Sequence, residues 1–248
     1  MGGQVDSTPD LKAALEKLKT DFIAIQEIDY NLPRSGEINQ IAEIAAAMGA
    51  ADFCFAPAII GTPGEKWCKL RDSDDPYVSN KSPGTNPAGG YGIAIASKIP
   101  VLSYERLDLG RSLIGMPLLI SADKTRLIYV KDEPRVALIA HLENGWTVIN
   151  THLSFVPGVN LWQLAKIKRW IRKSGRRALI VGDLNMPFIL GKKWRSLNSQ
   201  KTYPSWKPAV QFDYILGEED LQVKTLESPK TGISDHLPLT IEILEGLR

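Results

Sequence analysis

An aspartate and an asparagine stand two residues apart at the end of a short apolar run. The run, Ala178-Leu179-Ile180-Val181, leads into Gly182-Asp183-Leu184-Asn185. Branched apolar residues in a run of this length predict a buried strand, and the glycine lets the backbone bend without a Cβ clash. Asp183 and Asn185 then offer an acceptor and a donor at the rim of a sheet, where open α/β proteins place their chemistry. An ordinary Asx turn explains the same residues equally well.

The same arrangement recurs elsewhere in the chain. Apolar runs lead into Glu27 and into His152, whereas Asp213 and the pair Asp235-His236 precede apolar runs. If the last two strands run antiparallel to the first three, all five clusters meet at one rim. Carboxylates gathered in this way would repel one another unless a cation lies among them. The pattern therefore predicts a site for a divalent cation.

Five motifs together resemble a known family. They are Gln26-Glu27, Thr151-His152, Gly182-Asp183-Leu184-Asn185, Phe212-Asp213-Tyr214 and Ser234-Asp235-His236. Their order resembles that of the endonuclease/exonuclease/phosphatase superfamily, which includes pancreatic deoxyribonuclease, apurinic endonucleases, bacterial sphingomyelinases and inositol polyphosphate 5-phosphatases. Each motif alone is weak, and the order of all five carries the resemblance. It implies a deoxyribonuclease I-like α/β fold, a four-layer α/β/β/α sandwich of two mixed sheets, with residues 1–248 as a single domain.

The resemblance also implies a metal site. Glu27 would be the principal ligand and Asp235 would lie near the metal. Hard oxygen ligands suit Mg²⁺ or Mn²⁺. The spacings Cys-x-x-Cys and His-x-x-x-His do not occur in the sequence, which argues against zinc.

The resemblance assigns catalytic roles to five residues. Asp183 and Asn185 would orient the attacking water and a phosphate oxygen. Asp213 would pair with His236 and favour its charged form. His152 would contact the phosphate or the leaving oxygen, and a histidine here resembles the deoxyribonuclease, sphingomyelinase and phosphatase branches more than the apurinic endonucleases.

Candidate substrate contacts are less specific. Arg135 begins a predicted inward strand at a place where relatives often carry an arginine near the phosphate. Trp194 and Arg195 belong to loop 187–211, which mixes aromatic and basic residues that could stack bases and hold phosphates. A purely structural role for this loop is supported equally well. Residues 57–90 show no period and predict a long loop beside the substrate groove.

Composition sets the broad limits. A chain of 248 residues suits one large α/β domain, and its formal net charge of +2 creates no field that would require nucleic acid as a partner. Two cysteines are too few for a disulfide framework, and no apolar run reaches the length of a membrane span. We expect a cytoplasmic monomer that binds a phosphoester substrate, with nucleic acid as one candidate.

Regular periodicity predicts the elements that position the motifs. Helices are predicted from Thr8 and over 37–48 and 160–173, and the basic side of the last is interpreted as a solvated face. Strand 22–26 should deliver Glu27. A hairpin with its turn at 143–145 should deliver His152.

One departure from the family is serious. Relatives usually begin with a strand ending in an asparagine that helps to hold the metal, but here Met1-Gly2-Gly3-Gln4 leads almost directly to the first helix. We expect one sheet to lack a strand, this form to be less stable and to bind metal weakly, and the natural product to begin upstream.

The leading interpretation is a divalent-metal-dependent phosphoesterase that hydrolyses a phosphodiester, as nucleases do, by metal-assisted attack of water. The alternative outside the enzymes is a catalytically impaired phosphate- or nucleic-acid-binding module. The missing strand supports the module, and the otherwise full set of site residues opposes it. A phosphomonoesterase or a lipid phosphodiesterase of the same superfamily also remains open, although the sequence shows no convincing apolar hairpin for membrane contact.

Overall fold

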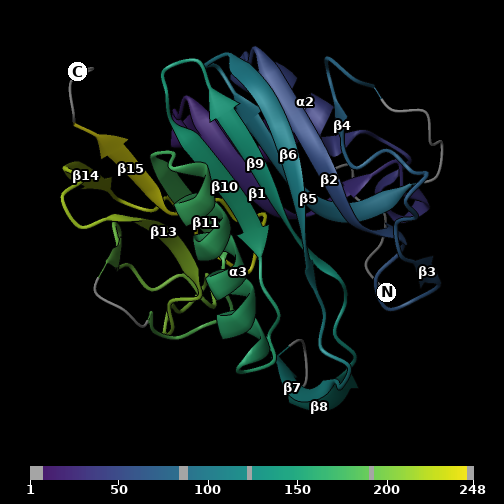
Figure 1. The fold of residues 1–248 in the computed structure, drawn as a ribbon. Coiled ribbons are helices and arrows are strands. Elements are labelled where there is room, and N and C mark those ends of the chain that lie inside the picture. Colours follow the sequence, from purple (N-terminus) through teal and green to yellow (C-terminus); the bar gives the residue numbers. More distant parts are fainter. Residues whose placement is uncertain (1–7, 84–88, 122–124, 190–192, 245–248) are drawn as a thin grey trace.

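Two β-sheets lie face to face between helices (Figure 1). The computed structural model describes residues 8–83, 89–121, 125–189 and 193–244. The first sheet has the order β1-β5-β2-β3, with β4 paired to β2 on a separate path. Its strands are β1 (Phe22–Tyr30), β2 (Asp52–Gly61), β3 (Trp67–Cys68), β4 (Val78–Ser79) and β5 (Gly90–Ser97). All pairs between these strands are antiparallel.

The second sheet has six strands in the order β12-β13-β11-β10-β9-β6. They are β6 (Val101–Gly110), β9 (Arg135–Leu142), β10 (Thr147–His152), β11 (Ala178–Asp183), β12 (Trp194–Ser196) and β13 (Asp213–Glu218). Strands β10 and β11 are parallel, and the other pairs are antiparallel. The predicted α/β sandwich is confirmed, although only this sheet is mixed.

Two further ribbons stand apart from the main sheets. Strands β7 (Met116–Ser121) and β8 (Thr125–Val130) form a two-stranded hairpin that projects from the body at the bottom of Figure 1. Strands β14 (Val223–Leu226) and β15 (Thr240–Ile243) pair only with each other within the described residues.

Helices cover the outer faces of the sheets. They are α1 (Thr8–Leu18), α2 (Gln40–Met48) and α3 (Val159–Ser174), with a 3-10 turn, η1, at Pro33–Ser35. Helix α2 begins later than predicted because the Asn39 side chain caps it by accepting a hydrogen bond from the Ala42 N–H. In the part of the chain that the structure describes, no helix is long and apolar enough to cross a membrane.

Apolar side chains fill the three spaces between the four layers. Between the sheets, Ile93 and Ile95 pack with Val136, Leu138 and Val148. The other two spaces lie beneath α1 and α2 and beneath α3. Burial of branched side chains on both faces explains why the central strands are almost continuously apolar.

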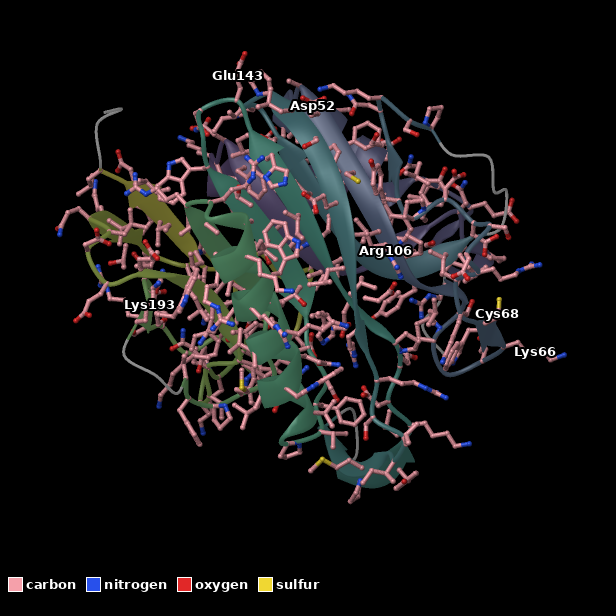
Figure 2. All side chains as sticks on the ribbon, viewed as in Figure 1. Asp52, Lys66, Cys68, Arg106, Glu143 and Lys193 are labelled. Carbon is pink, nitrogen blue, oxygen red and sulfur yellow. The ribbon has the colours of Figure 1, made fainter. Side chains whose placement is uncertain are left out.

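The segment 57–90 is more ordered than the sequence predicts. Strand β2 continues to Gly61, and β3 and β4 both pair with it. Lys66 and Cys68 project from the surface at the β2–β3 turn (Figure 2). Trp67 stacks with the Arg111 guanidinium, 5.7 Å from its ring centre, and so joins this turn to the base of the β7–β8 hairpin.

Candidate active site

Three neighbouring strands bring ionisable residues to one rim. In the parallel pair β10–β11, His152 lies opposite Asp183. Strand β13 runs antiparallel to β11, which places Asp213 at its first residue opposite Asp183. The antiparallel direction expected for the Asp213 strand is therefore present, and it brings the two carboxylates together.

Glu27 reaches this rim from the other sheet. The sequence predicted that this strand ends before Glu27. Strand β1 instead continues to Tyr30 through a bulge between Gln26 and Ile28. Glu27 has a left-handed backbone (φ 57°) in the bulge, and its side chain is 63% exposed. Its Oε1 lies 3.8 Å from His152 Nδ1. The bulge thus aims a carboxylate out of the sheet.

A tight turn holds Asp183 and Asn185. The Asn185 N–H donates to Asp183 Oδ1 at 2.7 Å, which is an Asx turn. Gly182 has φ 128°, and a Cβ there would collide with the Thr151 carbonyl oxygen of the adjacent strand. The residues form an Asx turn, and the same turn directs the side chains of Asp183 and Asn185 toward the rim.

The Asn185 side chain fixes the protonation of His152. Its Nδ2 donates to the Leu153 carbonyl at 2.9 Å, which sets the orientation of the amide. The same Nδ2 lies 3.1 Å from His152 Nε2, so this ring nitrogen accepts and the proton is on Nδ1. Burial, and then the charge of Arg135, hold the pKa of His152 well below 6.5. His152 is therefore neutral.

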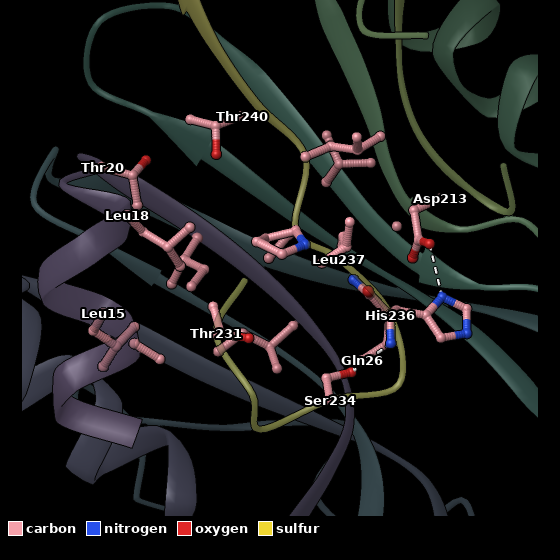
Figure 3. Close-up of a pocket in the computed structure, with 18 of the residues that line it drawn as sticks. Leu15, Leu18, Thr20, Gln26, Asp213, Thr231, Ser234, His236, Leu237 and Thr240 are labelled. Atoms are coloured by element: carbon pink, nitrogen blue, oxygen red, sulfur yellow. Dashed lines mark hydrogen bonds and ion pairs between the residues drawn. The ribbon is translucent and has the colours of Figure 1, made fainter. Parts of the chain in front are cut away.

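His236 is held in the opposite state. Its Nδ1 donates to Asp213 Oδ2 at 2.7 Å (Figure 3). Burial alone would lower the pKa of His236, but the hydrogen bond and charge of Asp213, followed by the charges of Asp183 and Asp235, raise it to about 9. The ring of Tyr203 packs 4.9 Å from the imidazole between centroids. A charged imidazolium thus stands beside a neutral histidine.

Asp183 has a pKa close to neutral pH. Burial and then repulsion by Asp213 raise the pKa of Asp183 to about 7, although the charge of His236 and the Asn185 N–H oppose the shift. Ligand atoms of Asp183, Asp213 and His236 lie within 4.8 Å of one another. Burial first, and then the charge of the second carboxylate, weaken the acidity of Asp183, and a cation among these groups would offset both effects.

The two residues that the resemblance assigns to the metal line one groove with Asp213 and His236. Asp235 is exposed, and its backbone carbonyl accepts from the Ser205 N–H at 2.7 Å. Glu27 is exposed as well. Both carboxylates therefore face solvent next to the partly buried Asp213 and His236, which suits a hydrated Mg²⁺ or Mn²⁺.

Arg135 lies next to this group. Its charge acts on His152, and its guanidinium lies 5.9 Å from the Phe155 ring centre and 3.4 Å from Asp132 Oδ1. Its Nε is buried without a hydrogen-bond partner among the described residues. This unpaired donor is a feature that an anionic ligand could satisfy.

Trp194 and Arg195 do not lie with this group, contrary to the sequence prediction. Trp194 pairs with Glu218, five residues along β13 from Asp213, which is about 17 Å at the usual rise of a strand. The Trp194 side chain is buried in the core under α3. Arg195 donates to the backbone carbonyls of Glu219 and Leu221. Trp194 and Arg195 therefore hold the edge strand β12 in place through core packing and backbone hydrogen bonds.

A family comparison decides the relationship. The model of the Endonuclease/Exonuclease/phosphatase family matches residues 3–236. The chain belongs to this family. The resemblance read from the five motifs is therefore confirmed, and membership supports phosphoester hydrolysis.

Solved structures share the fold of this endonuclease/exonuclease/phosphatase chain at low sequence identity. A functionally unknown conserved protein from Enterococcus faecalis V583 is 16% identical, with TM-score 0.59 over 96% of this chain and 92% of that one. The mannosyl-6-phosphatase Bt3783 of Bacteroides thetaiotaomicron VPI-5482 is 11% identical, with TM-score 0.56 over 96% and 90%. Truncated Caenorhabditis elegans TDP2 is 15% identical, with TM-score 0.51 over 94% and 90%. Comparison with curated proteins gave no match.

Sequence reasoning missed one residue that supports this endonuclease/exonuclease/phosphatase site. Asn150 is fully buried in β10, where its Nδ2 donates to the carbonyls of Ile25 and Ala94 and its Oδ1 accepts from Gln26 Nε2. It therefore ties the second sheet to the strand that carries Glu27. The signal was present, since an asparagine inside an apolar strand needs partners.

Proposed function

We propose that the protein is a divalent-metal-dependent phosphodiesterase. The observation that carries this proposal is the contrast between two neighbouring groups at one rim of the sheets. Asp183 has a pKa of about 7, so it can accept a proton, while His236 has a pKa of about 9 and can donate one. Acid and base separated in this way are the requirement of general acid–base hydrolysis.

The donor set fits a hard cation. Glu27 and Asp235 would hold Mg²⁺ or Mn²⁺, next to the carboxylates of Asp183 and Asp213. When bound, the cation supplies positive charge against the phosphate oxygens. The raised pKa of Asp183 supports this assignment, because burial and then the charge of Asp213 disfavour its ionised form, which a neighbouring cation would favour.

The chain's own residues divide the remaining work. Asp183 accepts a proton from the attacking water as its oxygen bonds to phosphorus, and the Asn185 turn holds the carboxylate in place. His236 uses Nδ1 for Asp213, so its Nε2 proton passes to the leaving oxygen as the phosphorus–oxygen bond breaks. Neutral His152 offers its Nδ1–H to a phosphate oxygen. Arg135 adds positive charge near His152.

A lipid phosphodiester is the second candidate substrate, because exposed apolar side chains lie at the base of the β7–β8 hairpin. Near the start of the β7–β8 segment, Leu113 is 95% exposed and Ile114 is 67% exposed, and Tyr129 on β8 is 64% exposed. Ser112 connects this segment to the site, since its N–H donates to Asp132, the partner of Arg135. Exposed apolar groups of this kind suit an interfacial substrate.

A substrate panel tests the proposal. Plasmid DNA, RNA, bis-p-nitrophenyl phosphate, p-nitrophenyl phosphate, inositol phosphates and sphingomyelin are each incubated with the protein and magnesium. We expect hydrolysis of at least one diester that Asp183→Ala abolishes and that the surface control Glu242→Ala retains. Hydrolysis of the monoester alone would overturn the diester assignment. Binding of substrates without any turnover would favour the impaired binding module.

A further inference from the structure

Helix α3 carries a concentration of positive charge that the rest of the molecule does not share. Residues 144–182 contain seven lysines and arginines and no aspartate or glutamate. Because the whole chain has a formal net charge of only +2, the remaining residues together are net acidic. The local potential, more than the net charge, determines where an anionic partner is attracted. The positive potential of this protein is therefore concentrated on one helix and the turn that follows it.

Three of these cations form a stripe on the exposed side of α3. Leu164 and Ile167 face the core and are buried against the second sheet. Arg169, Arg172 and Lys173 are exposed and lie three or four residues apart, which places them on one side of the helix. In the part of the chain that the structure describes, no carboxylate forms an ion pair with any of the three. We call these three residues the basic stripe.

Stabilisation of the helix accounts for only part of this charge. Arg172 and Lys173 lie in the last turn, where cations interact favourably with the helix dipole. That effect falls off within one turn, so it does not explain Arg169. A helix side that is merely solvated commonly mixes charges of both signs, whereas α3 contains no acidic residue. The composition therefore favours a surface that attracts an anion.

The first turn of α3 is fastened to the candidate active site. Asn160 Nδ2 donates to the backbone carbonyl of Asn185 at 3.0 Å, and Asn185 belongs to the turn that holds Asp183. Strands β10 and β11 are parallel and both end at the rim. Because α3 joins them, it runs from the rim back toward the start of β11 (Figure 1). The exposed side of α3 thus begins beside the site and leads away from it.

We propose that the exposed side of α3 binds a single strand of nucleic acid while a phosphodiester of the same strand lies at the rim. This inference rests on the proposed phosphodiesterase function and extends it to a polymeric substrate. Trp162, at the rim end of the helix, is 55% exposed, and an exposed aromatic ring is a surface on which a base stacks. From Trp162 to Lys173 the helix rises about 16 Å, so the basic stripe meets phosphates several nucleotides away.

A flexible polyanion fits this surface better than a membrane does. The rim lies at the strand ends, whereas α3 covers an outer face of the second sheet, so the two surfaces meet at an edge. A flat bilayer cannot contact both surfaces together, but a single strand can bend from one to the other. Within α3, which the structure describes in full, Leu161 and Trp162 are the exposed large apolar side chains. Insertion into a bilayer needs an apolar face along the helix, and the basic stripe supplies none.

Binding measured without hydrolysis tests this inference. A fluorescein-labelled oligodeoxythymidylate of about 16 nucleotides is titrated with protein in EDTA, and its anisotropy is read at several salt concentrations. The stripe variant is Arg169→Gln/Arg172→Gln/Lys173→Gln. We expect it to bind at least about tenfold more weakly at low salt. The slope of log Kd against log salt should fall by about 2, because each phosphate contact of a single strand contributes about 0.7.

A matched control separates the basic stripe from overall charge. Lys17→Gln/Lys19→Gln/Lys224→Gln removes three exposed cations outside α3 and should change neither the affinity nor the salt slope. Circular dichroism confirms that both triple variants fold. Hydrolysis of bis-p-nitrophenyl phosphate by the stripe variant should stay within about threefold of the unmodified protein, since this small diester does not extend along α3.

The possible outcomes separate the surface from the chemistry. Unmodified protein that does not bind the oligonucleotide, or equal weakening in the two triple variants, would overturn the inference. Sedimentation with phosphatidylserine vesicles that the stripe variant alone loses, with oligonucleotide binding retained, would overturn it in favour of a membrane. Oligonucleotide binding that depends on the basic stripe, in a protein that hydrolyses no diester, would support the surface and contradict the proposed function.

Discussion

Replacing Asp213 by asparagine should release the proton that the structure holds on His236. The Nδ1–Oδ2 hydrogen bond of 2.7 Å and the charge of Asp213 are the main influences that raise the pKa of His236 from 6.5 to about 9. The difference is about 2.5 pKa units, or about 3 kcal/mol at 1.36 kcal/mol per unit. Asp183 and Asp235 contribute a smaller part and remain in the variant. We therefore expect the pKa of His236 to fall by about 2 units in Asp213→Asn.

The assay is a pH titration of the imidazole Cε1–H signals by NMR. The chain has three histidines, which makes the assignment tractable. In the unmodified protein, His236 should titrate near pH 9, and His152 should stay neutral down to well below pH 6.5. The exposed control Asp220→Asn should change neither midpoint. A His236 midpoint at or below 6.5 in the unmodified protein, or one that Asp213→Asn leaves in place, would refute the dyad.

Three further outcomes follow from the same geometry. Asp183→Ala and His236→Ala should each lower turnover at least about 100-fold with an unchanged circular dichroism spectrum, and turnover within about threefold of the unmodified protein would mean that the site is misassigned. Activity should fall as the pH rises through about 9, because His236 must be charged to donate its proton, and a flat profile to pH 10 or so would exclude it as the acid. Asn150→Ala should lower the free energy of unfolding by about 2–4 kcal/mol in urea titrations, since it leaves the buried carbonyls of Ile25 and Ala94 without their donor; a loss below about 0.5 kcal/mol would show that the tie between the sheets is unimportant.

Strand ends could be predicted from the sequence because they depend on local composition. Apolar runs that stop at His152 and Asp183 correspond to β10 and β11, and their parallel pairing places the two residues side by side. The bulge at Glu27 could not be predicted. It depends on register with β5, where Gly92 lies opposite Ile28 on one side and Pro57 on the other.

Long-range strand pairing also determines the position of the residues that the sequence misplaced. Trp194 and Arg195 have the composition of a nucleic-acid-binding loop, but pairing with β13 directs them away from the site. The hairpin β7–β8 could not be recognised from the sequence, because its apolar residues are typical of a buried strand. Only the folded structure shows that it pairs with no other strand among the described residues.

Metal-dependent hydrolysis is the central claim, and one titration tests it most directly. The protein is stripped with EDTA, dialysed, and assayed with bis-p-nitrophenyl phosphate as magnesium or manganese is added, with Glu27→Gln as the variant and Glu242→Gln as its surface control. We predict no hydrolysis in the stripped protein, recovery that saturates with added metal, and a higher metal requirement in Glu27→Gln alone. Hydrolysis that survives exhaustive chelation, or a metal dependence that Glu27→Gln leaves unchanged, would contradict the account.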